Sequence, residues 1–267
     1  MKSLPKTSSD SQWRTFGSDG YLRLGQVVTE AELEGLRLRI DEIMLGRADV
    51  PFDRMMMQLD TETGLYEDMD PQSLGHKGAT LAYRKILGLE FDPLYLAYMQ
   101  KPLFRGICQR AYGVDVPISI YWAMFMNKPA ERGTVLPWHW DHYVGLDRPP
   151  GAIVWMALDD STLANGCIQV LPGTHQLFPD IDVLGKEQIA EALATHEPET
   201  LECSAGEAIL LHNKLLHTSS VNSTDTPRRA ISISYLDGRT MSSEGITFSR
   251  IFGLGALEPE KLGTAAG

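Results

Sequence analysis

The order of hydrophobic and polar positions divides the chain into a helix-rich first half and a strand-rich second half. From Ile118 onward, apolar residues form short runs separated by Gly, Pro, Asn and Asp: ISIYWAMFMN, GAIVWMALDD, CIQVLPG, AILLH and RRAISISYL. Runs of this kind are typical of β-strands. The spacings are too short for helical crossovers between parallel strands. We therefore expect an antiparallel sandwich or barrel with helices on one face.

The first half carries the signals for helices. Residues 21–28 have the character of a strand, and Thr29 follows with Glu32 three positions later, a capping box that opens a helix. The apolar stripe of that helix consists of Leu33, Leu36, Ile40, Ile43 and Met44.

Three further segments complete the expected order of elements. Residues 93–112 are expected to be helical with an interruption near Pro102, and an acidic helix is expected at about 186–197. Residues 50–80 show no clear period and are expected to form a long loop. We find no internal repeat, so we expect one domain over residues 1–267, helical at about 29–112 and with a β core at about 116–237.

Composition and charge narrow the classes of function. The 267 residues are 43% apolar and 22% charged, which is ordinary for a soluble globular protein. The formal charge of −11 disfavours nucleic acid and anionic lipid as partners. Three separated cysteines without a C-x-x-C pair indicate a reducing compartment. The N-terminus lacks the apolar core of a signal peptide, and no apolar run approaches about 18 residues. We expect a cytoplasmic protein.

The segment PWHWDH holds the clearest chemical signal. In an extended chain, residues two apart share a face, so His139 and Asp141 project together while Trp140 points away. An imidazole and a carboxylate on one face are two ligands of a divalent metal site. The alternative is a buried histidine that is held by a neighbouring aspartate.

A third ligand has to come from a later segment. The downstream candidates are His175, His196, His212 and His217. His217 has the best context, because HTSSVNST leads from it towards Arg228, Arg229 and another strand. Two histidines and one carboxylate form the facial triad with open positions that suits non-haem Fe(II) oxygenases.

Arg228 is the candidate for binding an oxo-acid cosubstrate. A carboxylate is bound best by the planar, bidentate guanidinium of arginine. The strand face of Arg228 continues with Ala230, Ser232 and Ser234, small residues that leave room in a barrel, whereas Arg229 lies on the opposite, bulkier face. The alternative is a pair of exposed arginines at a strand edge.

Together these segments resemble a known family. NKPA, PWHWD, VWMALDD, NGCIQVLPGTH and LLHTSSVNST…PRRAISISY follow in this order over residues 118–237. They resemble the phytanoyl-CoA dioxygenase-like group of Fe(II)/2-oxoglutarate-dependent oxygenases. The resemblance implies a double-stranded β-helix, a jelly-roll barrel like that of the cupins.

The resemblance also assigns roles to residues. It implies that His139, Asp141 and His217 bind Fe(II), and that Arg228 binds the distal carboxylate of 2-oxoglutarate, with O2 as the oxidant. Other cosubstrate contacts of the family match Lys85, Met124, Trp155 and Ser219. Met124 alternates with Trp122 and Met126, so its alternative is packing in the core. Because Asp141 keeps a position that halogenating relatives leave to a halide, we expect hydroxylation, oxidative ring closure or desaturation.

The substrate is expected to be a small molecule. No cluster of Lys and Arg for the phosphates of coenzyme A stands beside the motifs, so an acyl-CoA is not expected. Residues 52–70 contain six acids against one arginine, Arg54. If this loop covers the site, it favours a cationic, sugar-containing natural-product intermediate such as that of an aminoglycoside, and hence antibiotic biosynthesis. The alternative is a solvated surface loop. Tyr143, Asp147 and the segment RTMSSEGITFSRIFG are further candidates for substrate contact.

Two other classes of function remain. HWDH partly resembles the metal site of metallo-β-lactamase-like zinc hydrolases, but its first histidine is absent, His142 has to be a ligand, and Arg228 stays unexplained. The second is a non-catalytic barrel that binds a small ligand.

Overall fold

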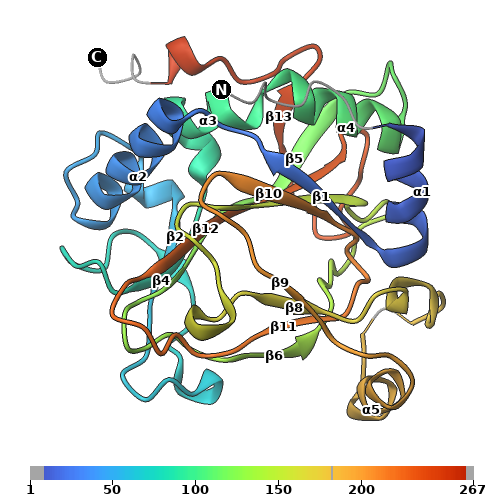
Figure 1. Ribbon diagram of the computed structural model, residues 1–267. Coiled ribbons are helices and arrows are strands. Elements are labelled where there is room, and N and C mark those ends of the chain that lie inside the picture. Colours follow the sequence, from blue (N-terminus) through green and yellow to red (C-terminus); the bar gives the residue numbers. More distant parts are fainter. Residues whose placement is uncertain (1–8, 182, 263–267) are drawn as a thin grey trace.

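Two antiparallel β-sheets face each other in the computed structural model, which describes residues 9–181 and 183–262 (Figure 1). In these residues the larger sheet has nine strands in the order β1-β10-β7-β12-β5-β4-β2-β3, with β13 paired to β5. The smaller sheet has the order β6-β11-β8-β9. The mainly β fold with flanking helices, a double-stranded β-helix, confirms the expected class. Residues 1–8 and 263–267, the ends of the expected domain, lie outside the described residues.

The strands of the larger sheet come from the whole length of the chain. They are β1 (Tyr21–Gln26), β2 (Met56–Leu59), β3 (Ser73–Leu74), β4 (Tyr83–Leu87), β5 (Ile118–Lys128), β7 (Ala152–Ala157), β10 (Glu207–Leu211), β12 (Arg228–Asp237) and β13 (Ser249–Phe252). Those of the smaller sheet are β6 (Leu136–His139), β8 (Ile168–Val170), β9 (Glu199–Leu201) and β11 (His217–Ser219). The β-rich runs found in the sequence match β5, β7, β8, β10 and β12, three of which extend one residue beyond the run.

In the described residues five α-helices accompany the sheets, and the first three begin at residues whose side chains accept from their first backbone N–H groups. They are α1 (Asp10–Asp19), α2 (Glu30–Met44), α3 (Pro93–Met99), α4 (Pro102–Tyr112) and α5 (Lys186–Thr195). Thr29 and Glu32 form the capping box of α2, as the sequence predicts. Asp92 caps α3, which has Pro93 in its first turn, and Pro102 opens α4. The interruption near Pro102 is therefore confirmed.

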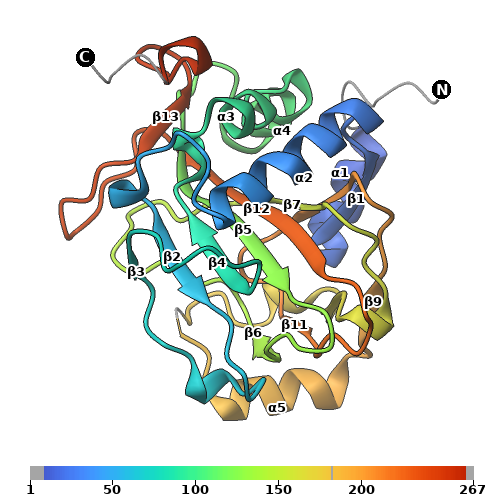
Figure 2. The same cartoon turned by 90° about the vertical axis from the view of Figure 1, so that its left-hand side faces the viewer.

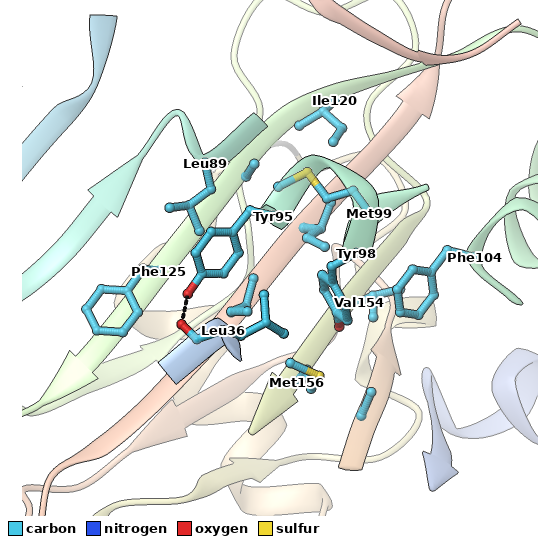
Figure 3. Packing of buried hydrophobic residues seen from close by; sticks show 14 of the residues in the cluster. Leu36, Leu89, Tyr95, Tyr98, Met99, Phe104, Ile120, Phe125, Val154 and Met156 are labelled. Atoms are coloured by element: carbon cyan, nitrogen blue, oxygen red, sulfur yellow. Dashed lines mark hydrogen bonds between the residues drawn. The ribbon is translucent and has the colours of Figure 1, made fainter. Parts of the chain in front are cut away.

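The larger sheet is buried on both faces because its residues alternate between two apolar clusters. On β7, Val154 and Met156 belong to the cluster beneath the helices, whereas Ile153 and Trp155 belong to the cluster between the sheets. The helical side is seen from close by in Figure 3, where the Tyr95 hydroxyl of α3 donates to the Leu36 carbonyl of α2 at 2.8 Å. The helices thus pack against one face of the larger sheet, and its other face borders the space between the two sheets.

The interpretation of residues 50–80 as a loop is wrong in part. β2 and β3 lie in this segment, and β4 follows it, so the expected helical part at 29–112 contains three strands (Figure 2). β2 and β3 have four and two residues, too few to show a period of two. β3 pairs with β2, β2 pairs with β4, and β4 pairs with β5; pairing with other segments leaves no local pattern in the sequence.

The helices of the described residues include none that is long and apolar enough to cross a membrane.

Candidate active site

Three side chains that ligate metals meet at the edge where β6 and β11 pair. His139, the last residue of β6, lies opposite His217, the first residue of β11, and their ring centroids are 4.2 Å apart. Asp141 follows two residues after His139, and its N–H donates to the Asn213 carbonyl at 2.9 Å. One possible ligand atom from each of the three side chains lies within 4.8 Å of the others. The structure thus brings together the triad predicted from the sequence.

Hydrogen bonds orient both imidazoles for metal binding. The Nδ1 of His139 lies 2.8 Å from the Pro137 carbonyl, and the Nδ1 of His217 lies 2.9 Å from the Leu215 carbonyl. Because a carbonyl only accepts, each Nδ1 carries the proton, and each Nε2 keeps its lone pair for a metal.

Burial sets the charges of the triad. Desolvation and the neighbouring His217 lower the pKa of His139 to about 3, so its ring is neutral at pH 7. Burial raises the pKa of Asp141, while His217 and Lys85 favour its charged form. A divalent cation removes this desolvation penalty by giving the carboxylate a partner. Two imidazoles and one carboxylate fit Fe(II), with further positions left open.

The other histidines considered as ligands lie elsewhere. His175 and His212 contact each other with ring centroids 4.8 Å apart, and His175 faces the Gly17 carbonyl. His196 lies at the end of α5 and contacts the Thr195 hydroxyl. His142 lines the pocket, but it is not part of the cluster of possible metal ligands found in the described residues.

A pocket between the sheets contains the triad and every cosubstrate-binding residue predicted from the sequence. Its lining includes His139, Asp141, His217, Lys85, Met124, Trp155, Ser219 and Arg228. The lining also includes Ser232 and Ser234 from the small-residue face of β12, Tyr66 from residues 52–70, and His142, the ligand of the zinc alternative. The remaining lining residues were not predicted as part of the site: Arg84, Trp122, Met126, Asn127, Lys128, Thr134, Leu136, Trp140, Ile153, Ile168, Leu211 and Thr218.

Arg228 is buried at the wall of this pocket with unused hydrogen-bonding capacity. Its side chain donates from Nη2 to the Gly166 carbonyl at 2.9 Å, while its Nε has no partner among the described residues. Gly166 has φ of 80°, and a Cβ there would lie 2.5 Å from the Ser220 carbonyl, so the close approach needs glycine. Burial lowers the pKa of Arg228 to about 10, which leaves it charged at pH 7. A buried, charged fork of this kind fits a carboxylate.

The two consecutive arginines differ as the strand pattern predicts. Arg229 points away from the pocket, donates to Asp159 from Nε at 2.8 Å and pairs with Asp41 at 2.7 Å. Ser232, two strand positions beyond Ala230, lies on the pocket side opposite both Met124 and Trp155.

The other predicted cosubstrate contacts surround the same space. Lys85 of β4 has its pKa lowered to about 8 by burial and by the adjacent Arg84, against the effect of Asp141. Met124, Ser219 and Trp155 are 8%, 4% and 1% exposed, so each is a wall of the pocket. Met124 therefore lines the site together with Trp122.

Sequence reasoning missed the basic character of the pocket. Arg84 and Lys128 line it together with Lys85 and Arg228, although no cluster of cations is visible beside the motifs. Lys128 lies an even number of residues from Met124 on β5, so strand alternation places both side chains on the same face. Because Met124 was predicted to line the site, this spacing could have predicted Lys128 as well. Arg84 had no such signal, because it adjoins Lys85 and alternation places neighbours on opposite faces.

The loops expected to contact a substrate contribute little to the lining. Of residues 52–70, only Tyr66 lines the pocket, and most of the acids are exposed to solvent. Tyr143 is buried behind the wall, with its hydroxyl 2.9 Å from that of Ser234, and Asp147 accepts from the Met241 N–H. These two candidates for substrate contact are therefore structural.

Comparison with known proteins gives the family. The family described as phytanoyl-CoA dioxygenase (PhyH) matches residues 16–230, well over half of the chain. A phytanoyl-CoA dioxygenase of Arabidopsis thaliana is 26% identical over 243 residues, which cover 82% of this chain and 85% of the relative. An L-proline trans-4-hydroxylase of Streptomyces griseoviridis is 24% identical over 244 residues, with 81% of each chain covered.

A solved structure shares the fold. EctD from S. alaskensis, crystallised with 2-oxoglutarate and 5-hydroxyectoine, superposes with a TM-score of 0.68 at 20% identity, covering 86% of this chain and 77% of that one. The expected cofactors, Fe(II), 2-oxoglutarate and O2, are confirmed as those of the family, and the donor set of the pocket fits them.

Proposed function

This chain belongs to the phytanoyl-CoA dioxygenase family of Fe(II)/2-oxoglutarate-dependent oxygenases, and we propose that it oxidises a C–H bond of a small molecule in the pocket between its sheets. The observation that supports this most strongly is the presence, in one pocket, of a His-Asp-His cluster and a buried arginine with an unused Nε donor. The first can hold the metal and the second can hold a dicarboxylic cosubstrate.

In this proposal His139, Asp141 and His217 bind Fe(II). The carbonyls of Pro137 and Leu215 hold the two rings so that Nε2 faces the metal. The iron, when bound with 2-oxoglutarate, supplies the oxidising power through O2.

Arg228 binds the distal carboxylate of 2-oxoglutarate, which suits its depth in the pocket and its bidentate donors. Lys85 lies near Asp141 and adds positive charge at the end of the pocket where the triad lies. Trp155, Met124 and Ser219 form the walls between these ends and exclude water from the cosubstrate.

The ligand set also limits the reaction. Because Asp141 supplies a carboxylate beside the two histidines, no position is left for a halide in its place. We therefore propose hydroxylation, oxidative ring closure or desaturation rather than halogenation. The natural-product tailoring role expected from the sequence stays a prediction, and its argument from the acidic loop loses force because those acids do not line the pocket.

We further propose that residues 1–267 act as one domain in the cytoplasm. Cys108, Cys167 and Cys203 are buried free thiols, and burial raises the pKa of each, which suits a reducing compartment.

The zinc-hydrolase alternative is less well supported. It needs His142 as a ligand, whereas the ligand atoms that cluster in the described part of the chain belong to His139, Asp141 and His217. It also gives no role to the unpartnered Nε of Arg228.

Paired substitutions test the proposed function. His139→Ala is expected to lose at least tenfold in Fe(II) affinity and to abolish the slow formation of succinate from 2-oxoglutarate under air. His142→Ala, the matched control, is expected to keep the iron, because its ring is outside the cluster. Metal content and succinate are measured on both proteins. Iron retained by His139→Ala but lost by His142→Ala would overturn the proposal.

A further inference from the structure

An irregularity in the β2–β4 pairing places two neighbouring cations at one pocket. Gln58 pairs with Lys85 and the next residue, Leu59, pairs with Tyr83, so Arg84 is an extra residue on β4. A bulge of this kind breaks strict alternation and redirects a side chain. Arg84 and Lys85 accordingly both line the pocket.

Arg84 is held in place without a carboxylate partner. Its Nη1 donates to the neutral Gln58 Oε1 at 3.1 Å, and its guanidinium carbon lies 5.4 Å from the centre of the Tyr66 ring. No ion pair of Arg84 occurs within 4.0 Å in the residues described. The charge of Asp60 acts on Arg84, but Asp60 makes no ion pair with it. Oδ1 of Asp60 accepts hydrogen bonds from the Thr134 hydroxyl and the Thr61 N–H, and its Oδ2 has no hydrogen-bond partner among the described residues.

The cations of the pocket exceed what the cosubstrate needs. In the proposed function Arg228 binds the distal carboxylate of 2-oxoglutarate and Lys85 lies at the triad. Lys128 has its pKa lowered to about 6 and is mostly neutral at pH 7, so Arg84 is the remaining charged group without an assigned partner. Burial lowers the pKa of Arg84, but a guanidinium stays protonated near pH 7. A charged group in a half-buried wall is stabilised most by an anion that enters the pocket.

We propose that Arg84 binds an oxyanion, a carboxylate or a phosphate, carried by the molecule that is oxidised. This inference rests on the proposed function and names the substrate class of the same site. The fork of Arg84 offers a bidentate contact, and Tyr66 covers it from the loop after β2. The inference replaces a cationic substrate with an anionic one, since the lining of the pocket, and not the exposed acids of residues 52–70, sets its preference.

The experiment uses the whole chain loaded anaerobically with Fe(II) and saturating 2-oxoglutarate. Calorimetry compares oxyanion probes with neutral counterparts: hexanoate with hexanamide, L-proline with L-prolinamide, and phenyl phosphate with phenol. The two carboxylate probes and the phosphate probe, each compared with its neutral counterpart, show whether Arg84 prefers a carboxylate or a phosphate. The unchanged chain is expected to bind at least one oxyanion at least tenfold more tightly than its counterpart.

Arg84→Gln is expected to lower that preference at least tenfold, and Arg84→Lys is expected to keep part of it. Arg47→Gln, which removes an exposed arginine outside the pocket, is the matched control and should keep it fully. Thermal unfolding verifies that each variant is folded.

Three results would overturn the inference: no oxyanion probe binds, each pair binds equally, or Arg84→Gln keeps the preference. If Arg84→Gln instead weakens 2-oxoglutarate binding tenfold, Arg84 serves the cosubstrate, which also overturns the inference. Failure of the unchanged chain to form the Fe(II)·2-oxoglutarate complex overturns the proposed function itself, and this inference with it.

Discussion

Lys128 is a lysine whose burial in the pocket wall lowers the stability of the folded protein. It is 5% exposed, lies directly opposite Arg228 on the neighbouring strand, and donates to the Thr134 carbonyl. Burial, Arg228 and Arg84 lower its pKa to about 6, while Asp60 acts in the other direction. The amine is therefore mostly neutral at pH 7 in the folded protein but protonated in the unfolded chain.

This difference predicts a pH-dependent stability. Between pH 6 and about 10 the unfolded chain binds the Lys128 proton and the folded protein does not, so this group makes stability rise with pH. Lys128→Met is expected to raise the free energy of unfolding of the metal-free protein at pH 7 by about 1–3 kcal/mol. The gain should shrink towards pH 10. Urea unfolding of both proteins from pH 6.5 to 9.5 checks this, and a gain that is independent of pH would contradict it.

Arg228 and Arg229 form a natural pair of test and control. Arg228→Ala removes charge-assisted hydrogen bonds to the cosubstrate. The concentration of 2-oxoglutarate that gives half-saturation is therefore expected to rise about 10–100-fold. Arg229→Ala removes the contacts to Asp159 and Asp41 and is expected to lower the melting temperature while leaving that requirement unchanged. Succinate formation and thermal unfolding distinguish them. Equal effects of the two variants on 2-oxoglutarate would refute the assignment.

At the scale of elements, strand parity explains which parts of the site the sequence could predict. Arg228 and Ser232 were assigned to the pocket side of β12 from the small residues on that face, and the structure has them there. His139 and Asp141 project together as expected. Their meeting with His217 depends on the pairing of β6 with β11, which distant sequence segments do not reveal except through resemblance to a family.

The bulge at Arg84 marks the limit of such reasoning. Its position is set by how β2 pairs with β4, and β2 itself shows no period. Alternation from Lys85 would place Arg84 on the far side. A cation of the pocket was therefore missed, and with it the argument for an anionic substrate.

The pocket-facing side of β12 carries small residues, and enlarging one of them tests where 2-oxoglutarate binds. Ser232 lies between Met124 and Trp155 in the sheet, so a larger side chain would fill the space proposed for 2-oxoglutarate. Ser232→Leu is expected to lower succinate formation at least tenfold while iron content stays near that of the unchanged chain. Ser232→Ala, which keeps the space, should behave like the unchanged chain. A Ser232→Leu protein that binds 2-oxoglutarate normally would show that the cosubstrate lies elsewhere.

At the scale of the whole molecule, the two sheets have different tasks. The larger sheet carries α1 to α4 on its outer face, whereas α5 lies beside the smaller sheet (Figures 1 and 2). The inner face of the larger sheet holds Lys85, Met124, Trp155 and Arg228. The smaller sheet brings His139 and His217 together at one edge. The two histidines of the proposed metal site therefore belong to the smaller sheet, and Arg228, proposed to bind the carboxylate, belongs to the larger sheet.

One measurement tests whether the His-Asp-His triad and Arg228 bind Fe(II) and 2-oxoglutarate in one complex. It is an anaerobic titration of metal-free protein with Fe(II) and 2-oxoglutarate, followed by visible absorption. We expect a weak charge-transfer band that needs both components, is absent in His139→Ala and needs more 2-oxoglutarate in Arg228→Ala. No band with both components present, together with tight zinc binding, would contradict the account and direct attention to hydrolysis.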